Sequence, residues 1–167
     1  MEIAPETLDE RVSRFVEGLK GAGVKLTPQR LEIFREVAKS ADHPDVETVF
    51  RGVRKRLPSV SLDTVYRTLW SLIDLGLLST VGHSRERVRF DANMGSHHHF
   101  VCEACGVMWD FQSDEFDRVR VPDVVRKLGS AQKTQVEIRG ICTRCSGETT
   151  SRRCASRRKE DRWKRRS

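Results

Sequence analysis

The stretch HHHFVCEACGVMWD, residues 97–110, places three histidines, two cysteines and two carboxylates within fourteen positions. In a strand successive side chains alternate between the two faces, so the first and third histidines share one face and His98 takes the other. Two imidazoles on one face form half of a metal site. Cys102 and Cys105 then form a tight turn whose two thiolates can hold one ion. The stretch predicts that the chain is organised around metal binding.

A second CxxC pair, Cys142 and Cys145, completes a set of four cysteines. Four thiolates close a tetrahedron around zinc at Zn–S distances of about 2.3 Å and leave no position for water, so the set predicts a structural zinc site. The gap between the pairs exceeds the roughly 15 to 20 residues of a minimal zinc ribbon, so a folded segment is expected to fill it.

Disulfides are the alternative use of these cysteines. The sequence contains no signal peptide and no apolar run of membrane length, and a fifth cysteine, Cys154, leaves the count odd. Disulfides belong mainly to oxidising compartments, so the sequence favours metal binding in a cytoplasmic protein without membrane association.

The formal net charge of +7 is concentrated at the C-terminal end. Residues 151–167 hold nine Lys and Arg against two acids, whereas the first 150 residues carry 22 of each sign. This composition predicts a disordered basic tail that strengthens contact with nucleic acid in a salt-dependent way. A tail that only adds solubility is an equal alternative.

The N-terminal part is predicted to be helical. Apolar residues recur at helical spacing over 7–21, and Thr27 is typical of the N-cap of a second helix. A third helix is expected over about 45–57, with its arginines and lysine outside, and Pro58 ends it.

The segment SLDTVYRTLWSLIDLGLL, residues 61–78, predicts a fourth helix that Ser61 caps. Short strands at 77–81 and 88–90 would follow it as a hairpin. Helices followed by such a hairpin indicate a winged helix-turn-helix, in which the polar early residues of the second helix of the motif face base edges. An ordinary small helical domain is the alternative.

Beyond residue 90 the pattern changes to short strands at 97–101, 107–111 and 135–141, with one helix at about 121–128. The fold class is therefore α+β: a winged helix-turn-helix followed by a small α/β domain with the four-cysteine zinc site. The predicted domains are 1–90, the DNA-binding winged helix, 91–150, which contains the metal ligands, and the basic tail 151–167.

Five motifs together are specific to one known family: GVKLTPQR at 23–30, SLDTVYRTLWSLIDLGLL at 61–78, RFD at 89–91, HHHFVCEACG at 97–106 and GICTRC at 140–145. Over about residues 7–146 the chain resembles the ferric uptake regulator (Fur) family of bacterial metal-dependent repressors. The resemblance implies a DNA-binding winged helix, a C-terminal domain that dimerises and a regulatory metal between the two.

The resemblance also implies two ligand sets. The four cysteines would hold structural Zn(II), for which thiolates are selective, while imidazole and carboxylate ligands suit regulatory Fe(II) or Mn(II). Carried over by position, the regulatory ligands are His43, Asp91, His97, His99 and Asp110. Some members carry a further site, whose positions here hold Ser96, His98, Asp117 and Thr134, so we do not expect that site to form.

By the same resemblance the function is transcriptional repression by a homodimer on double-stranded DNA with an inverted-repeat operator, because each protomer offers one recognition helix. Tyr66 and Arg67, with Thr64 beside them, are the expected base-contacting residues. Lys25 is expected near the minor groove or the backbone.

Asp110 bears on the stimulus. In the family, iron-uptake members tend to have glutamate at this position and peroxide-sensing members aspartate. The sequence therefore predicts a peroxide-responsive repressor in which iron-catalysed oxidation modifies His43 or His97. An iron-responsive repressor of metal uptake is the alternative.

A zinc-dependent nucleobase deaminase is the alternative from another class. Its signature is H-x-E followed by P-C-x-x-C. This chain has no H-x-E and no proline before either cysteine pair, and four cysteines would close the zinc shell. We therefore predict that the protein is not an enzyme.

Overall fold

A computed structural model of the chain describes residues 6–40, 42–81 and 88–147. The chain divides into two compact units, Met1–Gly95 and Ser96–Ser167, so that Asp91 belongs to the first. The predicted basic tail, Cys154 and the turn of the predicted hairpin lie outside the described residues.

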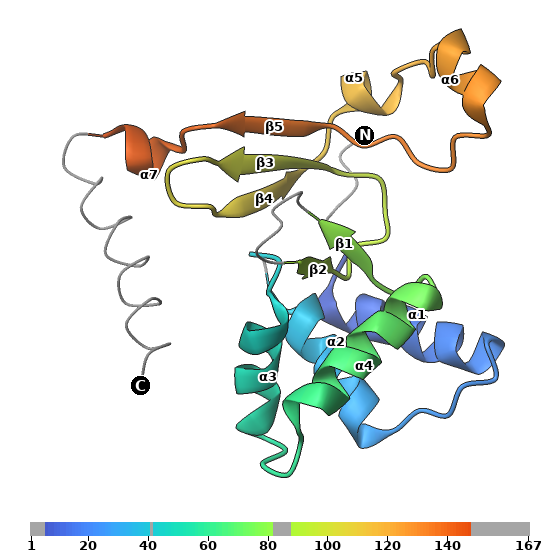
Figure 1. Cartoon of the computed structure of the whole chain (residues 1–167), viewed down its shortest axis with the longest axis vertical. Helices are drawn as coiled ribbons and strands as arrows, with labels where there is room; N and C mark the ends of the chain where they lie inside the picture. The colour runs from blue at the N-terminus through green and yellow to red at the C-terminus, as the bar shows by residue number, and fades with distance from the viewer. Residues whose placement is uncertain (1–5, 41, 82–87, 148–167) are drawn as a thin grey trace. The chain divides into compact units, whose positions relative to one another are not determined.

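The first unit consists of four helices followed by two short antiparallel strands (Figure 1). This order agrees with the sequence prediction, and the element bounds differ only at the ends, where the predicted third helix and first strand were too long. The elements are α1 (Leu8–Gly21), α2 (Pro28–Ala38), α3 (Val46–Arg54), α4 (Leu62–Asp74), β1 (Ser79–Val81) and β2 (Arg89–Asp91).

Each of the four helices begins at a side chain that accepts a hydrogen bond from a backbone amide of the first turn. Such caps satisfy amides that have no partner within the helix. After α4 the chain turns at Gly76, whose φ of +67° lies in the left-handed region that glycine adopts without a steric penalty. The N-caps are Thr7, Thr27, Asp45 and Ser61.

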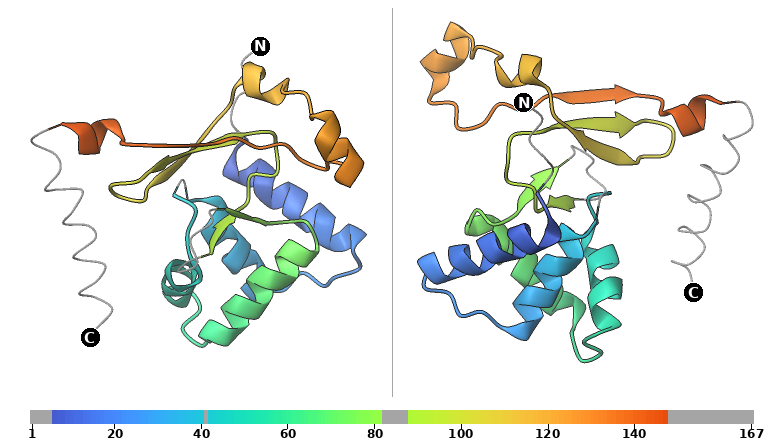
Figure 2. Two further views of the ribbon diagram at one scale, coloured as in Figure 1. Left: turned by 45° about the horizontal axis from the view of Figure 1, so that its top comes forward. Right: turned by 180° about the vertical axis from the view of Figure 1, so that it is seen from behind.

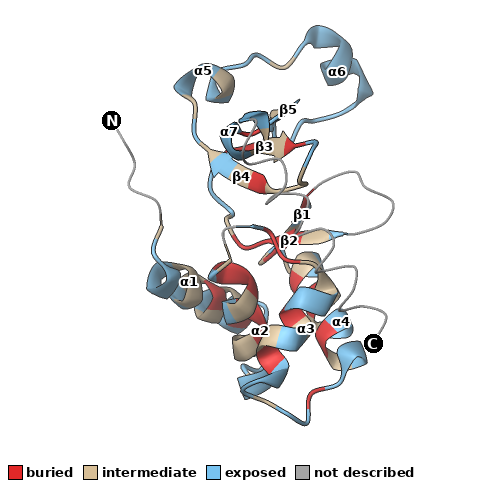
Figure 3. Ribbon diagram, turned by 90° about the vertical axis from the view of Figure 1, so that its left-hand side faces the viewer, coloured by how far each residue is buried: buried red, intermediate tan, exposed pale blue. Residues whose placement is uncertain are grey.

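The apolar faces of the four helices meet in one core, which Figure 3 shows as buried stretches on facing sides of the helices. Phe15 of α1 and Phe34 of α2 stack with ring centroids 4.1 Å apart. Arg56, just after α3, is exposed as expected, and it also bonds Glu32 and Glu36 of α2. The ion pairs hold the end of that segment against α2.

The second unit is built on a three-stranded sheet in the order β4-β3-β5, with β3 in the centre (Figure 2). β4 is antiparallel and β5 parallel to β3. The strands are β3 (His98–Cys102), β4 (Met108–Phe111) and β5 (Glu137–Gly140), and the helices are α5 (Asp114–Asp117), α6 (Asp123–Leu128) and α7 (Thr143–Ser146).

Two of these helices were missed by the sequence prediction, which placed only one helix, at about 121–128, between the last two strands. α5 and α7 have four residues each, which is about one turn and too short to show helical periodicity. The α+β fold class is confirmed.

The second unit contains few buried apolar side chains. Among its described residues the buried ones are Cys102, Met108 and Cys142 together with the three histidines 97–99. Large apolar side chains remain on its surface, with Leu128 85% and Val124 64% exposed. The interior of this unit is therefore made mainly of sulfur and imidazole groups, and apolar burial alone provides little stability.

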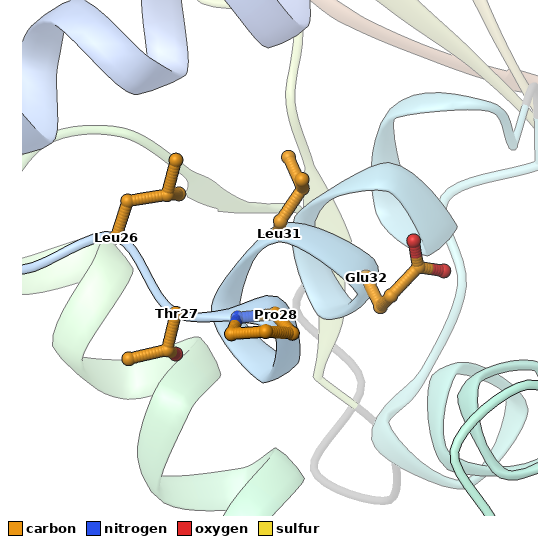
Figure 4. A pocket seen from close by; sticks show the side chains of 5 residues that line it. All are labelled: Leu26, Thr27, Pro28, Leu31 and Glu32. Carbon is orange, nitrogen blue, oxygen red and sulfur yellow. The ribbon is translucent and has the colours of Figure 1, made fainter.

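The loop before α2 and the start of that helix line a shallow pocket, shown in Figure 4. Leu26 and Leu31 point to the same side of it, and Glu32 provides its only carboxylate. Sites for small molecules usually combine an apolar lining with several convergent polar groups, which this pocket lacks. No helix in the described ranges is long and apolar enough to span a membrane.

Two glycines of α1 allow a matched test of packing. A Cβ at Gly18 would lie 2.3 Å from Cδ2 of Leu77, whereas nothing lies within 4 Å of one at Gly21. Because overpacking displaces neighbouring side chains, we expect Gly18→Ala to unfold with a free energy about 1–3 kcal/mol below that of Gly21→Ala. Urea titrations of both variants would measure this, and equal midpoints would contradict the close packing of α1 on Leu77.

Candidate metal centre

The sulfur atoms of four cysteines converge in the second unit. Cys102 ends β3, Cys105 lies in the following turn, and Cys142 and Cys145 belong to the start and body of α7. All four sulfurs lie within 4.8 Å of one another, and Cys105 Sγ is 3.9 Å from Cys142 Sγ. A zinc tetrahedron with Zn–S bonds of about 2.3 Å has S···S edges of about 3.8 Å. The residues therefore fit this ion.

Backbone pairing brings the two cysteine pairs together. The parallel register of β3 and β5 sets Cys102 beside Gly140, and the Glu103 amide donates to the Gly140 carbonyl at 2.8 Å. The turn after β3 closes through the Gly106 amide, which donates to the Cys102 carbonyl at 2.7 Å. Cys142 follows β5 directly, so it arrives beside the first pair. The long gap between the pairs is filled by β4, α5, α6 and β5, as the sequence predicted.

The electrostatic surroundings of Cys102 favour its thiolate. Burial raises the pKa of this thiol, but hydrogen bonds from the backbone of Cys142 and Cys105 and from their thiols outweigh it and lower the pKa to about 6. The Cys142 amide is 3.3 Å from the Cys102 sulfur. Because the thiolate is the species that binds metal, this sulfur is ready to do so at neutral pH.

A second group of ligand atoms lies near the start of β3, at the opposite end of this strand from Cys102. His97 and His99 are buried, and their Nε2 atoms are 3.1 Å apart. Asp110 is the β4 partner of His99 in the strand register, and its Oδ1 lies 3.4 Å from His99 Nε2. Gln135 donates to the His97 carbonyl at 3.2 Å and so holds the start of β3. His99 therefore lies beside both a second imidazole and a carboxylate.

The first unit contains a buried pair, His43 and Asp91. Nε2 of His43 is 3.8 Å from Oδ1 of Asp91, and the residues are 3% and 4% exposed. His43 has a φ of +48°, a conformation that costs energy for any residue with a side chain. Arg89 stabilises this loop by donating to the Asp42 carbonyl at 2.8 Å, and the Asn93 amide donates to Asp91 Oδ1 at 2.7 Å.

His98 lies on the opposite face of β3, as strand alternation predicts. Its Nδ1 accepts from the Val136 amide at 3.2 Å, so Nε2 carries the proton and lies 3.4 Å from Asp117 Oδ1. The hydroxyl of Ser96 also donates to Asp117. Thr134, the fourth position of the family's further site, is exposed. Ser96, His98 and Asp117 thus lie together, but only His98 and Asp117 are strong metal ligands. Asp117 contacts both of the other two residues.

The expected DNA-contacting residues lie in the first unit. Arg67 and Tyr66 are exposed on α4. The aromatic rings of Tyr66 and Trp70 pack with their centroids 6.0 Å apart. The hydroxyl of Thr64 is 2.8 Å from that of Ser61, so it takes part in the helix cap. Lys25 is exposed in the loop before α2.

Sequence reasoning missed the residues that hold these groups in place. Gln135 and Asn93 carry no motif of their own, and their roles depend on contacts with distant or irregular segments. Arg89 could have been noticed because it begins the RFD segment, but its partner Asp42 belongs to a different loop.

Comparison with known proteins shows the family of the chain. The profile of the ferric uptake regulator family matches residues 21–138. The chain belongs to this family. The peroxide-responsive repressor PerR of Staphylococcus epidermidis is 30% identical over 145 residues, covering 86% of this chain and 95% of that protein. PerR of Staphylococcus aureus is 28% identical over 147 residues, covering 87% and 98%.

The fold is shared with solved members of the family. The structure of the Helicobacter pylori ferric uptake regulator Fur, which reveals three functional metal binding sites, matches with a TM-score of 0.67 at 25% identity and covers 86% of this chain and 96% of that one. The family resemblance read from the sequence is thus confirmed.

The cysteine cluster is expected to be required for folding. Cys142→Ser removes one of four zinc ligands and should abolish the cooperative unfolding of the second unit, since that unit has few buried apolar side chains. Cys154→Ser, which leaves all four clustered cysteines in place, is the matched control. Thermal melts with zinc analysis would test this. A cooperative melt of Cys142→Ser equal to that of the control would contradict a structural site.

Proposed function

We propose that the protein is a metal-dependent transcriptional repressor that binds double-stranded DNA as a homodimer. The observation that carries the proposal is the position of His99 beside both His97 and Asp110, apart from the four clustered cysteines. Two donor sets of different chemistry suit two ions of different roles. A closed thiolate set suits a permanent structural ion, and an imidazole-carboxylate set suits an exchangeable one.

Structural Zn(II) is assigned to Cys102, Cys105, Cys142 and Cys145. For the regulatory ion, Fe(II) or Mn(II), the ligands are His97, His99 and Asp110 of the second unit together with His43 and Asp91 of the first. Membership of the family supports a regulatory site with ligands from both units. The burial of His43 beside Asp91 supports the inclusion of these two residues in that site. A buried carboxylate and imidazole are costly to desolvate, which a bound cation offsets.

A second copy of the chain is the proposed partner of the apolar surface of the second unit. Val119, Val124, Leu128, Ile138 and Ile141 are large apolar residues that the single chain leaves exposed. Their burial against a symmetric copy would stabilise a unit that has little apolar core. The dimer presents two α4 helices, which explains why the operator should be an inverted repeat.

Metal control of DNA binding is tested with the Mn(II) protein. We expect the affinity for an inverted-repeat operator to rise about 5- to 150-fold on adding Mn(II), the usual range of coupling between two sites. His99→Ala should lose this gain, while Tyr66→Ala should bind metal normally and lose specific binding, since base contacts provide specificity. Gel shift at fixed salt is the measurement, and equal affinity with and without metal would refute metal-dependent repression.

Peroxide is the proposed stimulus. Aspartate at position 110 and the similarity to PerR proteins of two staphylococci support it. Fe(II) held by these ligands would activate peroxide, and peroxide itself would be the two-electron oxidant of the ring. His43 or His97 gains one oxygen on its ring as 2-oxo-histidine, and the other peroxide oxygen leaves as water. The modified ring binds metal poorly, so the protein releases DNA. An iron-responsive repressor of metal uptake is the competing function.

Mass spectrometry separates the two functions. After brief low-dose peroxide without dioxygen, the Fe(II) protein should gain one oxygen at His43 or His97, whereas the Mn(II) protein should not, because Mn(II) does not readily drive this reaction. Asp110→Glu changes the carboxylate reach by one methylene and should suppress the oxidation while metal-dependent DNA binding remains. Oxidation confined to cysteines would return the assignment to iron-responsive repression.

A further inference from the structure

The outward face of α4 is centred on two side chains of opposite charge. Val65, Leu69 and Leu72 define the buried face of this helix. With 100° between successive residues, Asp63 and Arg67 lie nearly opposite these three. Their side chains are 75% and 79% exposed, and Nη1 of Arg67 is 3.9 Å from Oδ2 of Asp63.

The surroundings of this pair are polar. A shallow groove on the first unit runs beside α4, and it contains hydroxyl and guanidinium groups together with the carboxylate. Tyr66 points to another side of the helix, toward Trp70, and Trp70 in turn contacts Phe90 of β2. The residues lining the groove are Arg30 of α2 and Asp63, Thr64, Arg67, Thr68 and Ser71 of α4.

A carboxylate at this position is unusual for a surface that approaches DNA, because phosphates repel it. It is favourable where it accepts a hydrogen bond from a base. In the major groove aspartate can accept a hydrogen bond from the N4 amino group of cytosine. Adenine also has an amino donor, but next to it lies the N7 acceptor, to which a carboxylate cannot donate. Guanine offers two acceptors, O6 and N7, that match the guanidinium of Arg67.

We infer that Asp63 is a specificity-determining residue that selects a cytosine in the major groove, beside a guanine contacted by Arg67. The two residues are one helical turn apart, about 6 Å along the axis, so they can reach the same or adjacent base pairs. The ion pair between them is long and both side chains are exposed, so both are available to contact bases. Each operator half-site therefore contains a C·G pair at a fixed position under α4. The inference rests on the proposed DNA binding.

A purely structural role for Asp63 makes a different prediction. An acid in the first turn stabilises a helix through the backbone dipole. Ser61 already caps this helix by accepting from the Thr64 amide at 3.1 Å. If Asp63 served only the helix, its replacement would change stability and would leave the preferred base unchanged.

The experiment is selection from random duplexes at fixed salt with the full-length Mn(II) protein. Wild type should select a C·G pair at one position of each half-site. Asp63→Asn should shift that position toward A·T, because asparagine pairs with adenine N6 and N7. Asp63→Ala should remove the preference, with a discrimination loss of about tenfold, and should bind non-specific duplex more tightly.

Asp74→Asn is the matched control, because it removes the same charge from the exposed C-terminal end of the same helix. It should select the wild-type sequence. If wild type selects an operator and the Asp63 variants select the same one, the inference is overturned and DNA binding stands. If wild type enriches no sequence, both the inference and the proposed function are overturned.

Discussion

Alternation of side chains along β3 is the constraint on which the second unit depends. β3 is the central strand, and neighbouring residues at its start must point to opposite faces. His99 therefore joins His97 and Asp110 on one face, while His98 bonds Val136 and Asp117 on the other. A shift of one residue in the pairing of β3 would move each histidine to the opposite face of the sheet. The strand register therefore determines which side chains can act together as ligands.

The two units gain stability in different ways. The first has a continuous apolar core from four capped helices. The second has sulfur and imidazole where a domain of this size usually has apolar groups. Metal binding and association with a second copy are then sources of folding energy, because the single chain buries little apolar surface there.

This difference has a functional consequence under the proposed mechanism. A unit with its own apolar core can keep its DNA-contacting helix intact in every state of the sensor. Regulation then acts through the buried pair His43 and Asp91, which belongs to that stable unit. His43 has a left-handed backbone in a loop that Arg89 contacts at the Asp42 carbonyl, so the proposed ligand would be placed before an ion arrives.

The sequence by itself determined features that depend on neighbouring residues: the helix caps at Thr27 and Ser61, the alternation of the histidines and the two CxxC turns. Only the tertiary structure decided which distant segments meet. Parallel pairing of β3 with β5 brings Cys142 to Cys102, and Arg56 turns back onto α2. Local periodicity carries no information on such pairings, because they depend on the packing of segments far apart in the chain. Helical periodicity does set Asp63 and Arg67 opposite the buried face of α4, but it could not show that Arg30 of α2 lies beside them.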